Sequence, residues 1–169
     1  MTSDVRVIDV PGIARFEVAP HNCFACGTLN TNGMGLVLHV EPDRSWADLV
    51  LEARFQGWDG IAHGGILCTI LDEVMAWSLA GTDDWGVTAR MSVDFRRPVP
   101  LETSLRAEGW IEDRRRRIIH TSGRIVDAVS GAEFATATGV YMTANEERKA
   151  ELRQRYGLRS DSPEFVAGP

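Results

Sequence analysis

The sequence predicts an α+β fold in which an antiparallel β-sheet wraps around one long central helix. Two observations carry this prediction. Residues 64–80 repeat apolar side chains at helical spacing, and β-prone segments separated by short turns lie on both sides of them. A sheet of this kind must cover one of its faces, and a single mostly apolar helix is the obvious cover.

A β-hairpin is expected before the helix. Residues 35–40 are apolar and β-prone, and residues 46–55 alternate apolar with polar side chains. Pro42, Asp43 and Arg44 between them are typical of a turn.

The central helix is expected over residues 64–80, with Gly81 ending it. Apolar residues surround it almost completely, which is typical of a helix buried on most sides. Because Asp72 and Glu73 interrupt the apolar stretch, we do not expect it to span a membrane.

Four strands are expected after the helix, over residues 87–99, 103–111, 117–126 and 134–142. Their short turns predict an antiparallel meander. A charged helix follows over residues 144–156.

The length of 169 residues suits one domain. We expect a lead-in over residues 1–20, a globular domain over 21–144, and a C-terminal helix and tail over 145–169.

Apolar residues make up 44% and charged residues 25%, as in soluble globular proteins. The net charge of −6 argues against a nucleic-acid partner. The first residues lack the pattern of a secretory signal, so a cytoplasmic location is expected.

Three cysteines, an odd number, argue against a disulfide framework. Cys23 and Cys26 form a C-x-x-C pair, and a zinc site would need two further ligands, for which His21 and His39 offer no regular spacing. A redox pair would sit at a helix start, which the following Gly27 does not favour. We predict no metal and no resident cofactor, and keep a metal or redox module as an alternative.

The most specific motif is His63-Gly64-Gly65 at the helix start, with Asp72 nine positions after the histidine. After the helix the sequence reads VDFRRPVPL over residues 93–101, and before it CFACG over 23–27. Together these segments resemble the hotdog-fold thioesterases, the superfamily that includes 4-hydroxybenzoyl-CoA thioesterase and the phenylacetate-pathway thioesterases. The resemblance covers residues 21 to 143.

The resemblance implies a hotdog fold, an acyl-CoA substrate and hydrolysis of its thioester. It also implies a homodimer, with a dimer of dimers (a homotetramer) left open. In such a dimer each active site lies between two protomers, and the carboxylate of one chain faces the H-G-G segment of the other.

Gly64 and Gly65 are candidates for the oxyanion hole. A helix N-terminus presents free N–H groups and the positive end of the helix dipole, and glycine lets a thioester approach closely. The resemblance makes the Gly64 N–H the main donor. The alternative is that both glycines only permit a tight turn into the helix.

Asp72 is the candidate general base or nucleophile. A carboxylate within an apolar helix is costly unless it faces a cleft or a partner, which makes it a site candidate on physical grounds. The alternative is a buried aspartate paired with an arginine. Glu73 is the rival catalytic residue, but it lies about 100° further round the helix, and we favour Asp72.

Four further polar residues are candidates near the motif. Thr88 stands where related thioesterases carry a serine or threonine that holds the attacking water, although β-propensity alone also explains it. His63 either orients the loop or contacts the thioester, and a structural role is the alternative. Gln56 and Asp59 are the only polar residues in the stretch before His63, and are candidates for substrate binding.

Arg96 and Arg97 are candidates for contacts with the phosphates of CoA, because the guanidinium fork suits phosphate. The run of residues 114–117, all arginine, is a further candidate, with a solvated turn as the alternative. Trp58, Trp77 and Trp85 flank the motif and either line an acyl pocket or pack in the core.

The sequence therefore predicts a thioesterase acting on an aryl- or fatty-acyl-CoA. One alternative is a non-catalytic acyl-CoA-binding protein. The Asp72 carboxylate argues against it, because a binding site gains nothing from an anion beside the thioester. The other is a hydratase or dehydratase that uses His63 and Asp72 to move a proton on carbon, which the spacing of the motif disfavours.

Overall fold

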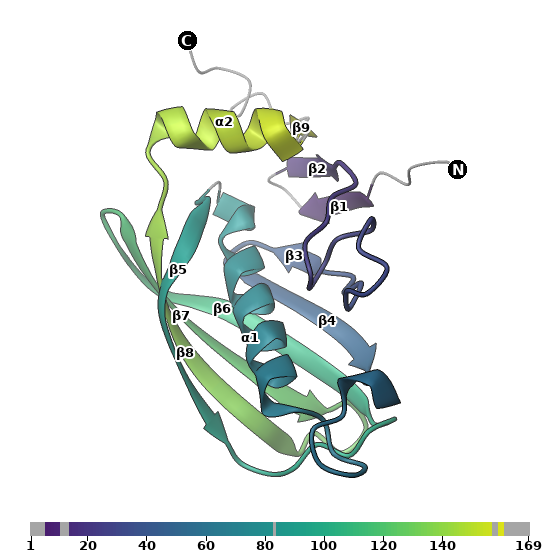
Figure 1. Cartoon of the computed structure of the whole chain (residues 1–169). Helices are drawn as coiled ribbons and strands as arrows, with labels where there is room; N and C mark the ends of the chain where they lie inside the picture. Colours follow the sequence, from purple (N-terminus) through teal and green to yellow (C-terminus); the bar gives the residue numbers. More distant parts are fainter. Residues whose placement is uncertain (1–5, 11–13, 83, 157–158, 161–169) are drawn as a thin grey trace.

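The computed structural model describes residues 6–10, 14–82, 84–156 and 159–160. Its main feature is a six-stranded antiparallel sheet that curves around helix α1 (Gly64–Ser78), as Figure 1 shows. The strands of this sheet are β3 (His39–Glu41), β4 (Arg44–Val50), β5 (Gly86–Phe95), β6 (Ser104–Arg115), β7 (Ile118–Asp127) and β8 (Glu133–Thr143). The predicted α+β class, with one sheet around one central helix, is confirmed.

The order of strands corrects the expected meander. The sheet runs β3-β4-β6-β7-β8-β5, so β5 pairs with β8 at the far edge and not with β6, the next strand in sequence. Residues 96–103 carry the chain back from β5 to β6, which pairs with β4. Alternating apolar residues predict strands but do not predict which strands are neighbours. Because β5 is the last strand of the sheet, its outer edge is unpaired within the described chain.

Helix α1 packs on the concave face of this sheet. Ile70, Leu71, Val74 and Met75 are fully buried there against strands β4 to β8. By length and composition the stretch 64–82 could cross a membrane, but half of it is buried inside the protein, as in the core helix of a globular domain.

Gly109 on β6 allows the helix to approach the sheet closely. A Cβ atom at this position would lie 2.5 Å from the backbone carbonyl carbon of Val74, a distance at which the helix would have to move. Gly109 also stands opposite Gly123 of β7, so α1 rests on a pair of glycines. The small residues of the sheet thus fix the depth of the helix, and with it the position of Asp72.

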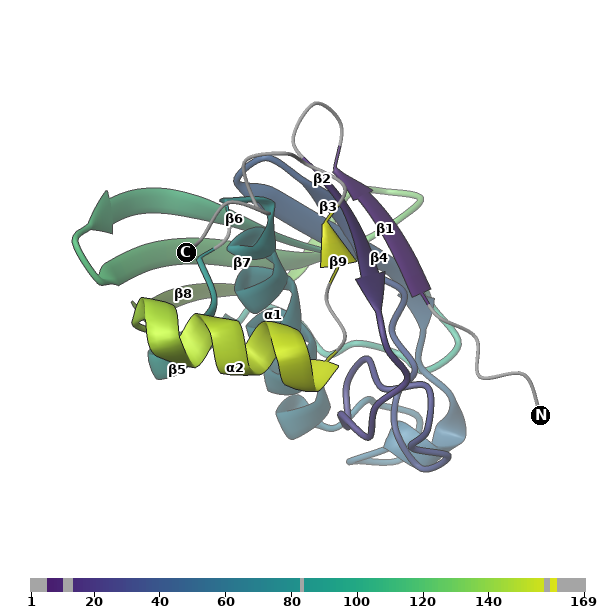
Figure 2. The same cartoon turned by 90° about the horizontal axis from the view of Figure 1, so that it is seen from above.

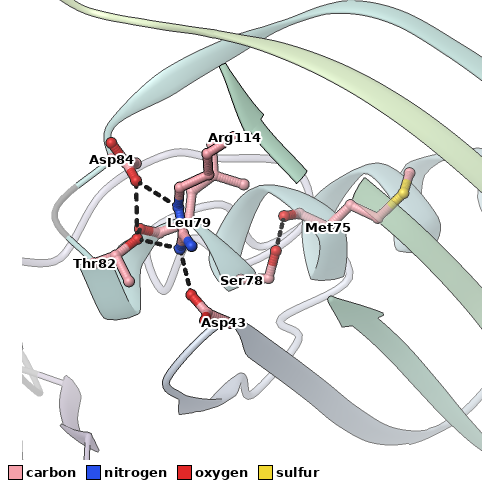
Figure 3. Close-up of polar contacts among 7 residues, drawn as sticks. All are labelled: Asp43, Met75, Ser78, Leu79, Thr82, Asp84 and Arg114. Atoms are coloured by element: carbon pink, nitrogen blue, oxygen red, sulfur yellow. Dashed lines mark hydrogen bonds and ion pairs between the residues drawn. The ribbon is translucent and has the colours of Figure 1, made fainter. Parts of the chain in front are cut away.

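The C-terminal end of α1 is held by a polar network (Figure 3). Arg114 of β6 bridges the carboxylates of Asp43 and Asp84, and its Nη2 lies 2.9 Å from the Thr82 hydroxyl oxygen. Thr82 in turn donates to Asp84 Oδ2 at 3.0 Å. This network ties η2 (Ala80–Thr82), which follows α1, to the β3–β4 turn and to the end of β6.

A second layer covers one end of the molecule. Strands β1 (Arg6–Val10), β2 (Ala14–Val18) and β9 (Arg159–Ser160) form a small antiparallel sheet, and helix α2 (Glu146–Tyr156) lies across the same end (Figures 1 and 2). The segment expected as a lead-in thus contributes a β-hairpin, because Val18 and Ile8 are buried beside Val40 and Ala80.

Candidate active site

The loop before α1 is shaped by its own polar groups. The Gln56 side-chain oxygen accepts a hydrogen bond from the Gly60 N–H at 2.9 Å, and Gln56 also forms an isolated bridge with Ala62. Gly60 has a φ of +72°, which favours glycine. The Gln56 side chain therefore closes the turn, while Asp59 stands exposed on it.

The N-terminus of α1 distinguishes the two glycines of the motif. His63 is the N-cap residue, and its Nδ1 accepts a hydrogen bond from the Gly65 N–H at 2.9 Å. Within the part of the chain that the structure describes, the Gly64 N–H has no acceptor. The expectation that both glycines offer free N–H donors therefore holds for Gly64 alone. The Gly65 N–H already donates to His63, and the Gly64 N–H remains available to a ligand.

An open hollow of about 310 Å³ lies beside Gly64. Phe95 closes one side of it, since a Cβ on Gly64 would lie 3.4 Å from the Phe95 ring. The exposed residues Arg96 and Arg97 line the same hollow, and the Arg96 guanidinium is 3.9 Å from Asp94. The structure therefore brings two of the predicted cations next to the predicted oxyanion donor.

Asp72 lies on α1 and its carboxylate faces the sheet. Two hydroxyl groups donate to its Oδ1: Thr88 of β5 at 2.6 Å and Tyr141 of β8 at 2.8 Å. The Tyr141 hydroxyl also lies 3.0 Å from the Asp72 backbone oxygen. Because both donors converge on Oδ1, Oδ2 is the oxygen left to meet a water or a thioester. The alternative of an aspartate paired with arginine finds no support among the described residues.

Thr88 reaches Asp72 because β5 is irregular at this point. The pairing of β5 with β8 shifts register between Thr88 and Arg90, and such a bulge re-aims nearby side chains. Thr88 stands directly opposite Tyr141 in this pairing. The hydroxyl proton of Thr88 is used on Asp72, while its lone pairs remain able to accept from a water, as its predicted role requires.

Tyr141 was not singled out from the sequence. Its side chain is fully buried, and burial, followed by the charge of Asp72, raises the pKa of its phenol. Tyr141 therefore stays protonated and donates to the carboxylate across the neutral pH range. The sequence offered one signal, because Tyr141 is the only large polar side chain between the two end residues of β8, Glu133 and Thr143.

We expect Tyr141→Phe to lower kcat about tenfold with little change in KM, because the ring is kept and only the hydroxyl that orients Asp72 is lost. A lost hydrogen bond to a charged group should also lower the free energy of unfolding by about 1.5–3 kcal/mol. Steady-state kinetics and urea denaturation measure the two effects. An unchanged kcat in a correctly folded variant would remove Tyr141 from the site.

Glu73 points to different neighbours. Its Oε1 accepts a hydrogen bond from the Trp77 indole N–H at 2.9 Å, and its carboxylate lies within 4.8 Å of the sulfurs of Cys23 and Cys26. Burial raises the pKa of the Glu73 carboxyl. These contacts make Glu73 a support for the segment around residues 21–26, whereas Asp72 is the carboxylate that meets Thr88.

The cysteine pair and Glu73 form a cluster of potential metal ligands. The hydrogen bond from the Cys26 thiol lowers the pKa of Cys23 to about 5, while the same contact and burial raise that of Cys26. His21 lies close, with Nε2 3.9 Å from the Cys26 sulfur, but its Nδ1 accepts from the Cys23 N–H at 3.2 Å. A neutral imidazole cannot accept at Nδ1 and also ligate through Nε2. The cluster therefore offers three ligands, one fewer than a structural zinc site needs, and the absence of a metal remains a prediction.

The arginine run of residues 114–117 forms the end of β6 and the turn into β7. Arg114 belongs to the network of Figure 3, Arg115 pairs with Asp113 at 2.7 Å, and Arg117 donates to the Thr143 carbonyl oxygen at 3.0 Å. Three of the four arginines thus serve local structure, which weakens the run as a phosphate-binding candidate relative to Arg96 and Arg97.

Comparisons with known proteins agree with this geometry. The model of the Thioesterase superfamily matches residues 59–132. Acyl-coenzyme A thioesterase THEM4 of Bos taurus is 24% identical over 95 residues, or 56% of this chain and 39% of that protein. Among solved structures, the thioesterase superfamily protein RHA08564 has a TM-score of 0.67 and 26% identity, covering 75% of this chain and 62% of its own.

A further solved structure, smu.793 from Streptococcus mutans UA159 bound to acetyl CoA, has a TM-score of 0.62 and 18% identity, covering 65% of this chain and 89% of its own. The matches span less than two thirds of THEM4 and of RHA08564. The matched segment includes the H-G-G motif and Asp72 of α1 and Thr88 of β5. Its helix packs against one curved sheet. Residues 59–132 thus match the Thioesterase superfamily, and the fold around them is the hotdog fold of the solved thioesterase structures.

Proposed function

We propose that this protein is an acyl-CoA thioesterase that hydrolyses its substrate to a free acid and CoA, and that it acts in the cytoplasm. The observation that carries the proposal is the pair of complementary groups on α1. One is the open N–H of Gly64, and the other is the Asp72 carboxylate, oriented by Thr88 and Tyr141.

These two groups do not act together within one chain. Asp72 lies eight positions after Gly64 on the helix, which places the two residues about 12 Å apart along the axis. A reacting carbonyl needs its attacking atom within about 3–3.5 Å. We infer that two copies of the chain combine, so that the Gly64 N–H of one meets the Asp72 carboxylate of the other.

The outer edge of β5 is the surface on which we propose that the copies meet. The strand is unpaired at this edge within the described chain, and it exposes the large apolar residues Val87 (70%) and Phe95 (55%). Open strand edges and apolar surface are both features that association covers. Phe95 lies beside Gly64 and Val87 precedes Thr88, so this edge adjoins both halves of the proposed site. A homotetramer would be a dimer of this dimer.

In the proposed reaction, Asp72 accepts a proton from a water that attacks the thioester carbonyl carbon. The oxygen becomes negatively charged and accepts a hydrogen bond from the Gly64 N–H of the other copy, helped by the dipole of α1. When the carbonyl re-forms, the C–S bond breaks and the proton passes from Asp72 to the CoA sulfur. The products are a carboxylic acid and CoA thiol. The same carboxylate would serve as a nucleophile if it attacked directly.

Arg96 and Arg97 are proposed to contact the CoA phosphates, because both are exposed beside the hollow at Gly64. The solved structure of smu.793 with acetyl CoA supports a CoA ligand for this fold. A hydratase role for His63 and Asp72 is less consistent with the geometry, since His63 Nδ1 already accepts a hydrogen bond from the Gly65 N–H and Asp72 lies nine positions further along the chain.

The test is the release of free thiol from a panel of acyl- and aryl-CoA thioesters by the purified protein. We expect turnover of at least one thioester. Tight binding of CoA thioesters without turnover would instead identify a non-catalytic acyl-CoA-binding protein.

A further inference from the structure

A second cavity, of about 300 Å³, lies at the C-terminal half of α1. Its walls come from α1, the start of β5, strand β2, the segment around residues 21–26, and helix α2. The apolar side chains that line it include Ala76, Trp77, Ala80, Trp85, Val87 and Leu152. Its volume is at the lower end of the range typical of small-molecule sites.

The cavity is apolar in character. The indole rings of Trp77 and Trp85 meet edge to face, with centroids 6.4 Å apart and planes at 78°. The carboxylate on its wall, Asp84, is paired with Arg114 at 3.2 Å and accepts from Thr82. The wall also carries His21, Cys23 and Cys26, but most of its surface is apolar, which suits a hydrocarbon better than a charged group.

The position of the cavity relates it to the proposed catalytic residue. Asp72 and Ala76 are four residues apart on α1 and so share one face of the helix, and Ala80 follows at the same spacing at the start of η2. On the facing strand, Val87 of the cavity directly precedes Thr88, which donates to Asp72. A chain that starts at Asp72 and follows this face would run along about two turns of helix, or about 12 Å.

We propose that this cavity receives the acyl chain of the substrate and that the protein selects linear chains of medium length, such as octanoyl and decanoyl. This inference rests on the proposed thioesterase function. Ala76 and Ala80 add little bulk to the helix side of the cavity, and the two tryptophans and Leu152 contribute large apolar surface to its wall. Residues 18–26 and α2 lie outside the segment matched by the superfamily model, so part of this pocket is built by residues beyond that segment.

The experiment compares kcat/KM for octanoyl-CoA and butyryl-CoA as a ratio. For the wild-type protein we expect this ratio to be at least about 10, because each buried methylene contributes to binding. Ala76→Leu, which fills the cavity from the helix, should lower the ratio about tenfold. Leu152→Trp fills it from α2, outside the core under the sheet, and should lower the ratio in the same direction.

Ala128→Leu is the matched control, because Ala128 is exposed in the turn between β7 and β8. It should leave the ratio unchanged. Circular dichroism and a thermal melt check that each variant is folded. If the wild-type ratio is near one, or if both folded cavity variants keep the wild-type ratio, the pocket assignment is wrong. If the wild-type protein hydrolyses neither thioester nor any other, the proposed function itself fails, and the two failures are therefore distinguishable.

Discussion

Replacing Asp72 with asparagine should lower kcat for thioester hydrolysis by at least about 100-fold, the scale on which a positioned general base contributes. Asparagine retains the shape of the side chain and can still accept from Thr88 and Tyr141 through its amide oxygen, so the fold should survive. What is lost is the ability to take a proton from water. KM should change little, because the CoA contacts are proposed to lie at Arg96 and Arg97.

Glu73→Gln is the matched control, because it makes the same chemical change at the neighbouring position. A glutamine can still accept from the Trp77 indole, and Glu73 faces the cysteines and not Thr88. Its kcat should therefore fall far less than that of Asp72→Asn. The reverse ranking of the two variants would assign the base to Glu73.

Gly64→Pro should lower kcat by about 100- to 1,000-fold, the usual effect of losing one oxyanion donor. Gly64 is the first residue of α1, a position that proline favours, because the N–H there has no partner inside the helix. The preceding His63 already has φ −67° and ψ 131°, the extended conformation that a residue before proline adopts. The substitution thus removes the proposed donor while keeping the start of the helix.

Gly64→Ala separates loss of the N–H from added bulk. It keeps the donor and adds a methyl group at 3.4 Å from the Phe95 ring, an ordinary contact. Its kcat should stay within about tenfold of the wild-type value. If alanine and proline at this position reduce kcat equally, steric crowding explains the loss and the oxyanion assignment fails.

The sequence allowed the central helix and its two chemical groups to be predicted. The apolar periodicity of residues 64–80 located α1 to within two residues of its end, and the spacing from His63 to Asp72 indicated which carboxylate to consider. Both signals are local, since helix geometry alone relates residues a few positions apart.

The supports of the site depend on contacts between distant segments, and the sequence did not reveal them. Tyr141 comes 69 residues after Asp72 and meets it only because β8 pairs with β5 at the edge of the sheet. The bulge that aims Thr88 is likewise a property of strand pairing. The use of the Gly65 N–H by His63 is a local contact, yet it depends on the rotamer of the histidine, which no spacing rule indicates.

In the proposed dimer, each active site uses Gly64 from one chain and Asp72 from the other. Joining a Gly64→Pro chain and an Asp72→Asn chain in one dimer, purified through two different affinity tags, tests this sharing. A shared site predicts one intact and one doubly defective site per mixed dimer, and hence about half of wild-type kcat per dimer, although each parent is nearly inactive. A mixed dimer as inactive as its parents would contradict the account, because both groups would then have to act within one chain.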